Sequence, residues 1–154
     1  MDPLTVDQDT PATPDVKALL LRHFDLMRAS SPEESSHVMQ PGALMDKGAV
    51  LFAARDTGTL LGVGALAQLD ALHGELKSMH TAEQARGRGV GQAILRALLD
   101  HARAQGLTRV SLETGSADLF APARALYARQ GFVYCPPFGA YVEDPHSVFM
   151  TRAV

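Results

Sequence analysis

Cysteine is almost absent from the sequence, and tryptophan is missing altogether. The single cysteine, Cys135, cannot form an internal disulfide, which suits a reducing compartment. Paired cysteines and a His-Glu-x-x-His pattern are also lacking, so no metal site is expected. Because nothing near Cys135 in the sequence would activate its thiol, we interpret it as a packed side chain and not as a nucleophile.

Long apolar runs and an excess of positive charge are missing as well. No apolar run approaches the ~18 residues that a membrane-spanning helix needs. The N-terminal segment is acidic and lacks the basic region of a signal peptide. The formal net charge of −3 does not indicate binding to nucleic acid or to an anionic membrane. We therefore expect a cytoplasmic protein with neither a nucleic-acid nor a membrane partner.

The composition is that of an ordinary globular protein, with 46% hydrophobic and 20% charged residues. The length favours a single domain that spans residues 1–154. Positive charge is concentrated in one segment, since residues 82–131 carry more arginines than acids while the remainder of the chain is acidic. A local basic patch on an acidic protein indicates a small anionic ligand.

Hydrophobic periodicity predicts mainly strands in the first half of the chain and alternating helices and strands in the second. The expected strands cover 4–7, 50–55, 60–69, 74–81, 110–113, 132–135 and 147–152. The expected helices cover 14–28, a short segment from 31 that ends before 41, 89–105 and 120–130. Antiparallel strands followed by a β-α-β-α-β order indicate a mixed α/β fold, with helices packed on a twisted sheet.

Regular alternation along 74–81 separates the side chains of this strand onto two faces. The pattern predicts that Glu75, Lys77 and Met79 lie on one face of the strand. Leu76, Ser78 and His80 are then expected on the other. In the strand before it, two glycines at 62 and 64 indicate close approach by another element.

Residues 83–91 form a loop rich in glycine and arginine, Glu-Gln-Ala-Arg-Gly-Arg-Gly-Val-Gly, before the clearest helical pattern. A helix that begins at Gly89 would direct several unpaired N–H groups and the positive end of its dipole outward, as a phosphate site requires. The spacing fits neither the dinucleotide fingerprint nor the nucleoside-triphosphate loop, because the third glycine and the Gly-Lys-Ser/Thr are missing. A flexible surface loop is the alternative for this stretch taken alone.

This loop and a later element together resemble the GNAT acyltransferase superfamily, in particular its small stand-alone bacterial members. The loop supplies Arg86-x-x-Gly89-x-Gly91 after the strand segment Lys-Ser-Met-His-Thr, and the later element reads Ala-Leu-Tyr-Ala-Arg-Gln-Gly-Phe. The resemblance covers most of the chain in element order and residues 74–135 in detail. It implies a GNAT-like fold, with a central twisted mixed β-sheet of six or seven strands and helices on both faces.

In that family the loop amides hold the pyrophosphate of acetyl-coenzyme A, and the preceding strand pairs with the pantetheine arm. By position, the resemblance implies cofactor-binding roles for Met79, His80, Thr81, Arg86, Gly87, Arg88, Gly89, Val90, Gly91, Gln92, Phe120 and Tyr127. Phe120 departs from the family, many of whose members carry asparagine there. A polar contact to the pantetheine arm is therefore lost or replaced by packing.

Acyl transfer to an amine requires a neutral amine, a polarised thioester carbonyl and a proton for the departing thiolate. Tyr127 matches the tyrosine that the family often uses as the acid, although a tyrosine merely packed on the sheet is the alternative. Glu75 and Glu113 are the candidates for the base, because an acid on a central strand is uncommon without a partner or a purpose. Each candidate has an alternative role, since Glu75 can form an ion pair with Lys77 and Glu113 can bind a cationic acceptor. His80 can shuttle protons, and water can also act as the base.

The resemblance places the acceptor site between the first two helices and the segment before the last strand. The candidates there are Ser36, His37, Tyr141 and His146. The expected acceptor is a primary amine of a small molecule or a peptide. Dimers are frequent in the family, so a homodimer is left open.

We therefore expect an acetyl-coenzyme A-dependent N-acetyltransferase. Direct transfer in a ternary complex is favoured, because no nucleophile elbow or serine triad is visible. Two alternatives come from other classes of protein. One is an acyl-coenzyme A-binding module that senses or regulates without catalysis, and the other is a phosphate-binding domain unrelated to coenzyme A.

Overall fold

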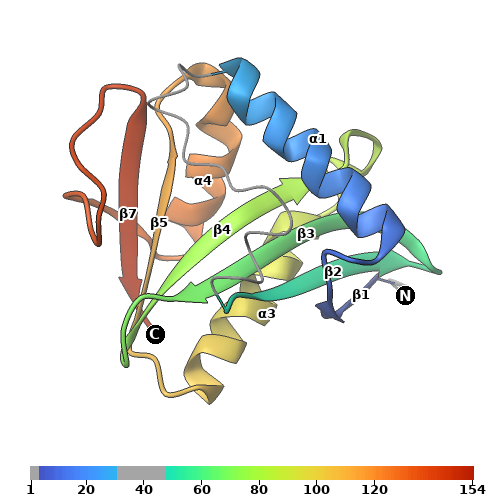
Figure 1. Ribbon diagram of the computed structural model, residues 1–154, viewed down its shortest axis with the longest axis horizontal. Coiled ribbons are helices and arrows are strands. Elements are labelled where there is room, and N and C mark those ends of the chain that lie inside the picture. The colour runs from blue at the N-terminus through green and yellow to red at the C-terminus, as the bar shows by residue number, and fades with distance from the viewer. Residues whose placement is uncertain (1–3, 31–47) are drawn as a thin grey trace.

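The structure, a computed structural model, describes residues 4–30 and 48–154. A twisted sheet of seven strands lies at the centre of this part of the chain (Figure 1). The strand order is β1-β2-β3-β4-β5-β7-β6, and β4–β5 is the parallel pair among otherwise antiparallel neighbours. The strands are β1 (Leu4–Asp9), β2 (Val50–Asp56), β3 (Thr59–Gln68), β4 (His73–Thr81), β5 (Arg109–Gly115), β6 (Val133–Cys135) and β7 (Ser147–Ala153). The mixed sheet confirms the predicted fold class.

Helices cover both faces of this sheet (Figure 1). α1 (Pro14–Ser30) crosses one face over β3 and β4, whereas α3 (Val90–Ala104) packs against β2 and β3 on the other. α4 (Ala121–Arg129) follows a short 3-10 turn, η3 (Asp118–Phe120), and a second such turn, η2 (Glu83–Ala85), precedes α3. The buried side of α3 is an apolar stripe that comprises Val90, Ile94, Leu95, Leu98, Leu99 and Ala102. None of the described helices is long and apolar enough to cross a membrane.

β4 and β5 separate halfway along their length. They pair only from His73–Arg109 to Leu76–Leu112. Beyond that point β4 continues beside β3, and β5 continues beside β7 as far as Gly115. The two strands diverge, and a cavity opens between them.

A bulge at Ser78 interrupts β4 where this separation begins. Ser78 has a φ of +55°, in the left-handed region that residues other than glycine rarely adopt. Lys77 pairs with Ala65, but the next registered pair is His80 with Val63, so β4 holds one residue more than β3 in this interval. Strained backbone of this kind is often found at functional sites.

The bulge makes the predicted alternation of β4 wrong beyond Lys77. Val63 and Ala65 share a face of β3, so their partners His80 and Lys77 share a face as well. Met79 points to the opposite face, where a Cβ added at Gly64 would overlap its sulfur. The inserted residue shifts the pleat by one position, and the sequence pattern alone does not reveal that shift.

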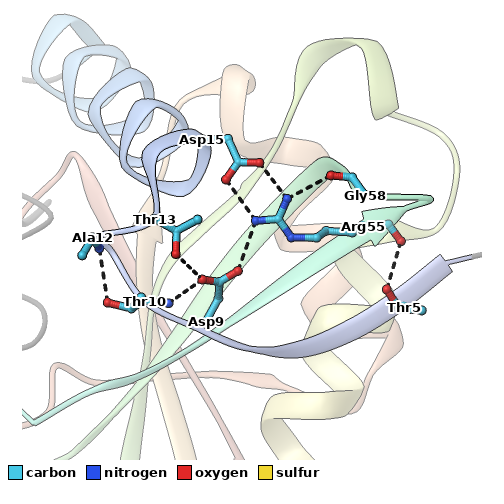
Figure 2. A network of polar contacts seen from close by, with 8 residues as sticks. All are labelled: Thr5, Asp9, Thr10, Ala12, Thr13, Asp15, Arg55 and Gly58. Carbon is cyan, nitrogen blue, oxygen red and sulfur yellow. Dashed lines mark hydrogen bonds and ion pairs between the residues drawn. The ribbon is translucent and has the colours of Figure 1, made fainter.

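Arg55 of β2 connects the start of α1 to the sheet (Figure 2). Its guanidinium forms a bidentate pair with Asp15, at 2.6 and 3.0 Å, and a second pair with Asp9 at 3.1 Å. It also donates to the carbonyl oxygen of Gly58 at 3.1 Å. The Thr13 hydroxyl, just before α1, donates to Asp9 at 2.7 Å. The network fixes the position from which α1 crosses the sheet.

Replacing Arg55 with glutamine is expected to lower the free energy of unfolding by about 2 kcal/mol. Removing one partner of a buried ion pair costs about 3–5 kcal/mol, and partial exposure of this network reduces that figure. Urea denaturation measures the change. Arg103→Gln is the matched control, because its pair with Asp100 is exposed and should contribute less than about 0.5 kcal/mol. Equal losses in the two variants would contradict a structural role for Arg55.

Candidate active site

A cavity of about 720 Å³ lies where β4 and β5 diverge, with walls from α1, α4 and the start of α3. Most of the residues predicted for the site line it: Glu75, Met79, His80, Thr81, Arg86, Gly87, Gly89, Val90, Gly91, Gln92, Glu113, Phe120, Tyr127, Tyr141 and His146. Residues from distant parts of the sequence therefore share one space.

Among the described residues predicted for the site, Arg88 is not part of this lining. Arg88 belongs to the loop but pairs with Asp56 of β2, with 2.8 Å between Nη2 and Oδ2. In this structure Arg88 therefore ties the loop to the β2–β3 hairpin. Ser36 and His37 lie outside the described residues, as does the short helix predicted from residue 31.

The loop before α3 has the geometry of an anion cradle. Gly87 and Gly89 have φ values of +81° and +77°, and a Cβ at either position would meet no atom within 4 Å. Backbone conformation, not crowding, therefore favours glycine at both. Gly89 is the N-cap of α3, and the first helical hydrogen bond runs from the N–H of Ala93. The N–H groups of residues 90–92 thus lie at the cavity without helical partners, as phosphate binding requires.

Tyr127 of α4 is buried against the ring of Phe132, with 5.8 Å between ring centroids, and it also lines the cavity. Burial, and next the negative charge of Glu113, raise the pKa of Tyr127, so its phenol stays protonated. None of the hydrogen bonds among the described residues involves its hydroxyl. A protonated phenol in the cavity wall can donate a proton to a leaving group.

Phe120, the last residue of η3, packs its ring directly on Gly115 at the end of β5. A Cβ at Gly115 would overlap this ring. Phe120 also lines the cavity, so this part of the wall is apolar.

Glu75, Lys77 and Tyr141 form a polar cluster on the β4 side of the cavity. Glu75 is only 4% exposed, and its Oε2 accepts a hydrogen bond from the Tyr141 hydroxyl at 2.6 Å. The Lys77 ammonium lies 3.3 Å from the same oxygen and 3.5 Å from the Tyr141 hydroxyl. Burial, and next the charge of Glu75, raise the pKa of Tyr141. The Glu75–Lys77 ion pair considered from the sequence is present, and Tyr141 joins it from a distant loop.

Glu113 contributes a second carboxylate from the β5 side. Its negative charge helps to raise the pKa of both Tyr127 and Tyr141. His146, in the loop before β7, is exposed where it borders the cavity. The two candidate bases, Glu75 and Glu113, therefore line one cavity from neighbouring strands.

Cys135 lies on β6, outside the lining of the cavity. Burial raises the pKa of its thiol, which makes the thiolate less available. Among the described residues, no group of three or more His, Cys, Asp or Glu side chains is placed to hold a metal ion.

His23 of α1 and His80 of β4 pack against each other inside the cavity wall, with 5.0 Å between ring centroids. Among the described residues, Nδ1 of His23 and Nε2 of His80 are buried without hydrogen-bond partners. Burial, and next His80, lower the pKa of His23 to about 4. Burial, and next Arg22 and Arg86, lower the pKa of His80 to about 4. Both rings are therefore neutral near pH 7.

This pair makes stability depend on pH. In the unfolded chain both histidines have a pKa of about 6.5, so the unfolded state binds protons first as the pH falls. Their contribution is complete above about pH 6.5 and is lost as the pH falls towards 4. Full shifts of both groups correspond to about 5 kcal/mol between about pH 7 and about pH 4.5, and partial exposure of His80 reduces the expected loss of unfolding free energy to about 3 kcal/mol, measured by urea denaturation. His23→Gln/His80→Gln should flatten this dependence, and an unchanged slope in that variant would contradict the assignment.

Sequence reasoning missed some contributors to the site. Arg22 reaches from α1 to Glu83, with 2.9 Å between Nη2 and Oε2, and both residues line the cavity. Nothing in the sequence marks Arg22, because it lies on the polar side of its helix. Lys77 was considered only as a partner of Glu75, although a charged pair two residues apart on a central strand was a usable indication.

Comparisons with known proteins agree with this geometry. Residues 16–132 match the model of the acetyltransferase (GNAT) family. The N-acetyltransferase YsnE of Bacillus subtilis, which is described as uncharacterized, is 42% identical over 137 residues, 89% of this chain and 91% of the relative. The IAA acetyltransferase of Azospirillum brasilense is 35% identical over 154 residues, 99% of each chain. A GNAT family acetyltransferase from Elizabethkingia anophelis, solved with acetyl-CoA bound, has a TM-score of 0.74 at 20% identity over 100% of each chain, a similarity of fold.

The chain therefore belongs to the GNAT family of acetyltransferases. Its relatives are named as enzymes, so the reading as a non-catalytic sensor is not favoured.

Proposed function

We propose that the protein transfers an acetyl group from acetyl-coenzyme A to a primary amine of a small molecule or a peptide. The observation that carries this proposal is one cavity that joins the anion cradle, the diverging strands and Tyr127. Its volume is within the range of ordinary ligand sites, roughly 300–1,000 Å³. Members of the family use this donor, and the Elizabethkingia anophelis structure contains it.

The anion cradle and the edge of β4 would bind different parts of the donor. The N–H groups of residues 90–92, supported by Arg86, suit the pyrophosphate because they combine donors with the positive end of the helix dipole. The edge of β4 at residues 79–81 faces the opening and suits an extended amide-containing arm, which can pair with it like an added strand.

The chemistry then follows from groups on the cavity walls. The amine attacks the thioester carbonyl carbon directly within a ternary complex, and the C–S bond breaks as the C–N bond forms. Tyr127, protonated because it is buried, gives its proton to the departing sulfur. Glu113 is placed to attract a cationic acceptor, and Glu75 is the base. Of the two relatives described above, the one from Azospirillum brasilense is named as an IAA acetyltransferase and YsnE is named for no acceptor, so the amine itself is left to experiment.

An acetyl-coenzyme A turnover screen tests the proposal. Small amines, amino acids and short peptides are incubated with the protein, thiol release is followed, and products are identified by mass spectrometry. We expect at least one amine to gain an acetyl group with saturable dependence on the donor. Donor binding without thiol release from any amine would favour the non-catalytic sensor instead.

A further inference from the structure

Only a small part of the Glu75 side chain reaches the cavity. Its side chain is 5% exposed, and the oxygen that faces its neighbours already accepts from Tyr141 at 2.6 Å and contacts the Lys77 ammonium at 3.3 Å. The heavy atom of a base must come within about 2.6–3.2 Å of the atom that carries the proton, directly or through one intervening group. Direct proton transfer from an acceptor to Oε2 would therefore require breaking the short hydrogen bond from Tyr141.

Tyr141 provides the intervening group. It is half-buried, lines the same cavity as Tyr127 and the anion cradle, and donates its only hydroxyl proton to Glu75. We propose that Tyr141 is a catalytic relay that takes the proton from the acceptor ammonium while passing its own proton to Glu75. This inference rests on the proposed N-acetyltransferase function and assigns the proton path within it.

The proton count of the relay balances. The acceptor enters as an ammonium ion, one N–H proton moves to the Tyr141 oxygen, and the Tyr141 proton moves to Oε2 of Glu75. The neutral amine then forms the C–N bond, and the C–S bond breaks. Tyr127 protonates the sulfur and recovers a proton from the nitrogen, directly or through water. Glu75 finally loses its proton to solvent, so that one proton is released per turnover.

The surroundings of the Tyr141 hydroxyl favour the transfer of a proton through it over a stable negative charge on it. Burial and the carboxylate of Glu75 raise the pKa of Tyr141, so the phenol cannot hold a negative charge and must pass its proton on. The Lys77 ammonium lies 3.3 Å from Oε2 of Glu75 and 3.5 Å from the Tyr141 hydroxyl oxygen, so it contacts both groups of the relay. Lys77 is thus a positioning residue for the relay.

Aromatic packing holds the Tyr141 ring independently of its hydroxyl. Its centroid lies 5.2 Å from that of Phe138 and 5.4 Å from that of Phe149. Tyr141→Phe therefore removes the hydroxyl and keeps these ring contacts. Glu75→Gln likewise keeps an acceptor for the Tyr141 hydroxyl but cannot accept its proton at neutral pH. Both variants are expected to fold, which circular dichroism verifies.

The test compares kcat of the full-length variants with acetyl-coenzyme A and two kinds of acceptor. With the best primary alkylamine of the screen, Tyr141→Phe and Glu75→Gln are each expected to lower kcat about 100-fold near pH 7, with KM for acetyl-coenzyme A unchanged. The double variant should lose no more than either single one, because the two groups act as a unit. The deficit should shrink as the pH approaches the pKa of the amine, about 10. Tyr134→Phe, an exposed tyrosine on β6, is the matched control.

Hydroxylamine is the second acceptor, because its nitrogen is already unprotonated at neutral pH and needs no relay. Both variants should acetylate it within about twofold of the wild-type rate, which a merely structural role for Tyr141 would not allow. Wild-type kcat for Tyr141→Phe with the alkylamine near pH 7, or equal losses with both acceptors, would overturn the relay and leave the acetyltransferase function standing. Failure of the wild-type protein to acetylate any acceptor would overturn the proposed function and the relay with it.

Discussion

Replacement of Tyr127 with phenylalanine is expected to lower kcat about 100-fold while the Kd for acetyl-coenzyme A stays within about twofold. General acid catalysis typically contributes 10²–10⁴-fold, and the thiolate leaving group would otherwise depart unprotonated. The ring remains packed against Phe132, so loss of the hydroxyl alone is measured. Steady-state kinetics with the best amine of the screen and donor titration by calorimetry give the two quantities.

An acyl donor with a more acidic thiol separates the acid role from a structural one. A thiophenyl ester needs little help from an acid when its thiolate departs, so its rate should fall much less in Tyr127→Phe than the rate with acetyl-coenzyme A. The deficit of this variant should also persist at high pH, unlike that of Tyr141→Phe. An unchanged kcat in Tyr127→Phe would reduce Tyr127 to a packing residue.

Gly89→Glu is expected to weaken acetyl-coenzyme A binding at least about 100-fold, or about 2.7 kcal/mol. A side chain at a φ of +77° costs about 1–2 kcal/mol of strain. The added carboxylate also opposes phosphate binding at the start of α3, where the helix dipole favours the ligand's negative charge. Gly89→Ala should show the strain alone and a smaller loss of affinity. Calorimetric titration of the donor measures both.

Gly106 supplies the matched control at the opposite end of the same helix. It has a φ of +81°, and a Cβ there would meet no atom within 4 Å. Gly106→Glu should therefore cost a similar amount of stability and leave donor affinity unchanged, because the site is at the other end of α3. Similar losses of affinity from Gly89→Glu and Gly106→Glu would show that helix destabilisation, and not the cradle, explains the effect.

Local features of the site could be predicted from the sequence. The loop needs positive φ at Gly87 and Gly89 and a helix that begins directly after it. Both features depend on residues that are neighbours in the sequence, so a local pattern can indicate them. The stripe on α3 follows from helical periodicity for the same reason. Tyr127 was singled out because its segment, Ala-Leu-Tyr-Ala-Arg-Gln-Gly-Phe, resembles the family, and the structure places it in the lining of the cavity.

Features that depend on tertiary contacts could not be predicted in this way. Serine is not a residue type that demands a left-handed conformation, so the bulge at Ser78 could not be predicted. For the same reason the sequence did not show that Met79 and His80 each point to the face opposite the predicted one. The hydrogen bond between Glu75 and Tyr141 joins residues 66 positions apart, and no local pattern encodes it. The sequence singled out Glu75 as an acid on a central strand, whereas its burial and its hydrogen bond to Tyr141 required the structure.

The early separation of β4 from β5 has a thermodynamic consequence. A donor arm that pairs with the β4 edge would restore hydrogen bonding across the sheet that the two strands give up beyond Leu76 and Leu112. A ligand that binds only the folded state stabilises it by about 2.7 kcal/mol at 100 times its Kd. The free energy of unfolding of this protein, and with it the resistance to proteolysis, would then rise with the concentration of acyl donor.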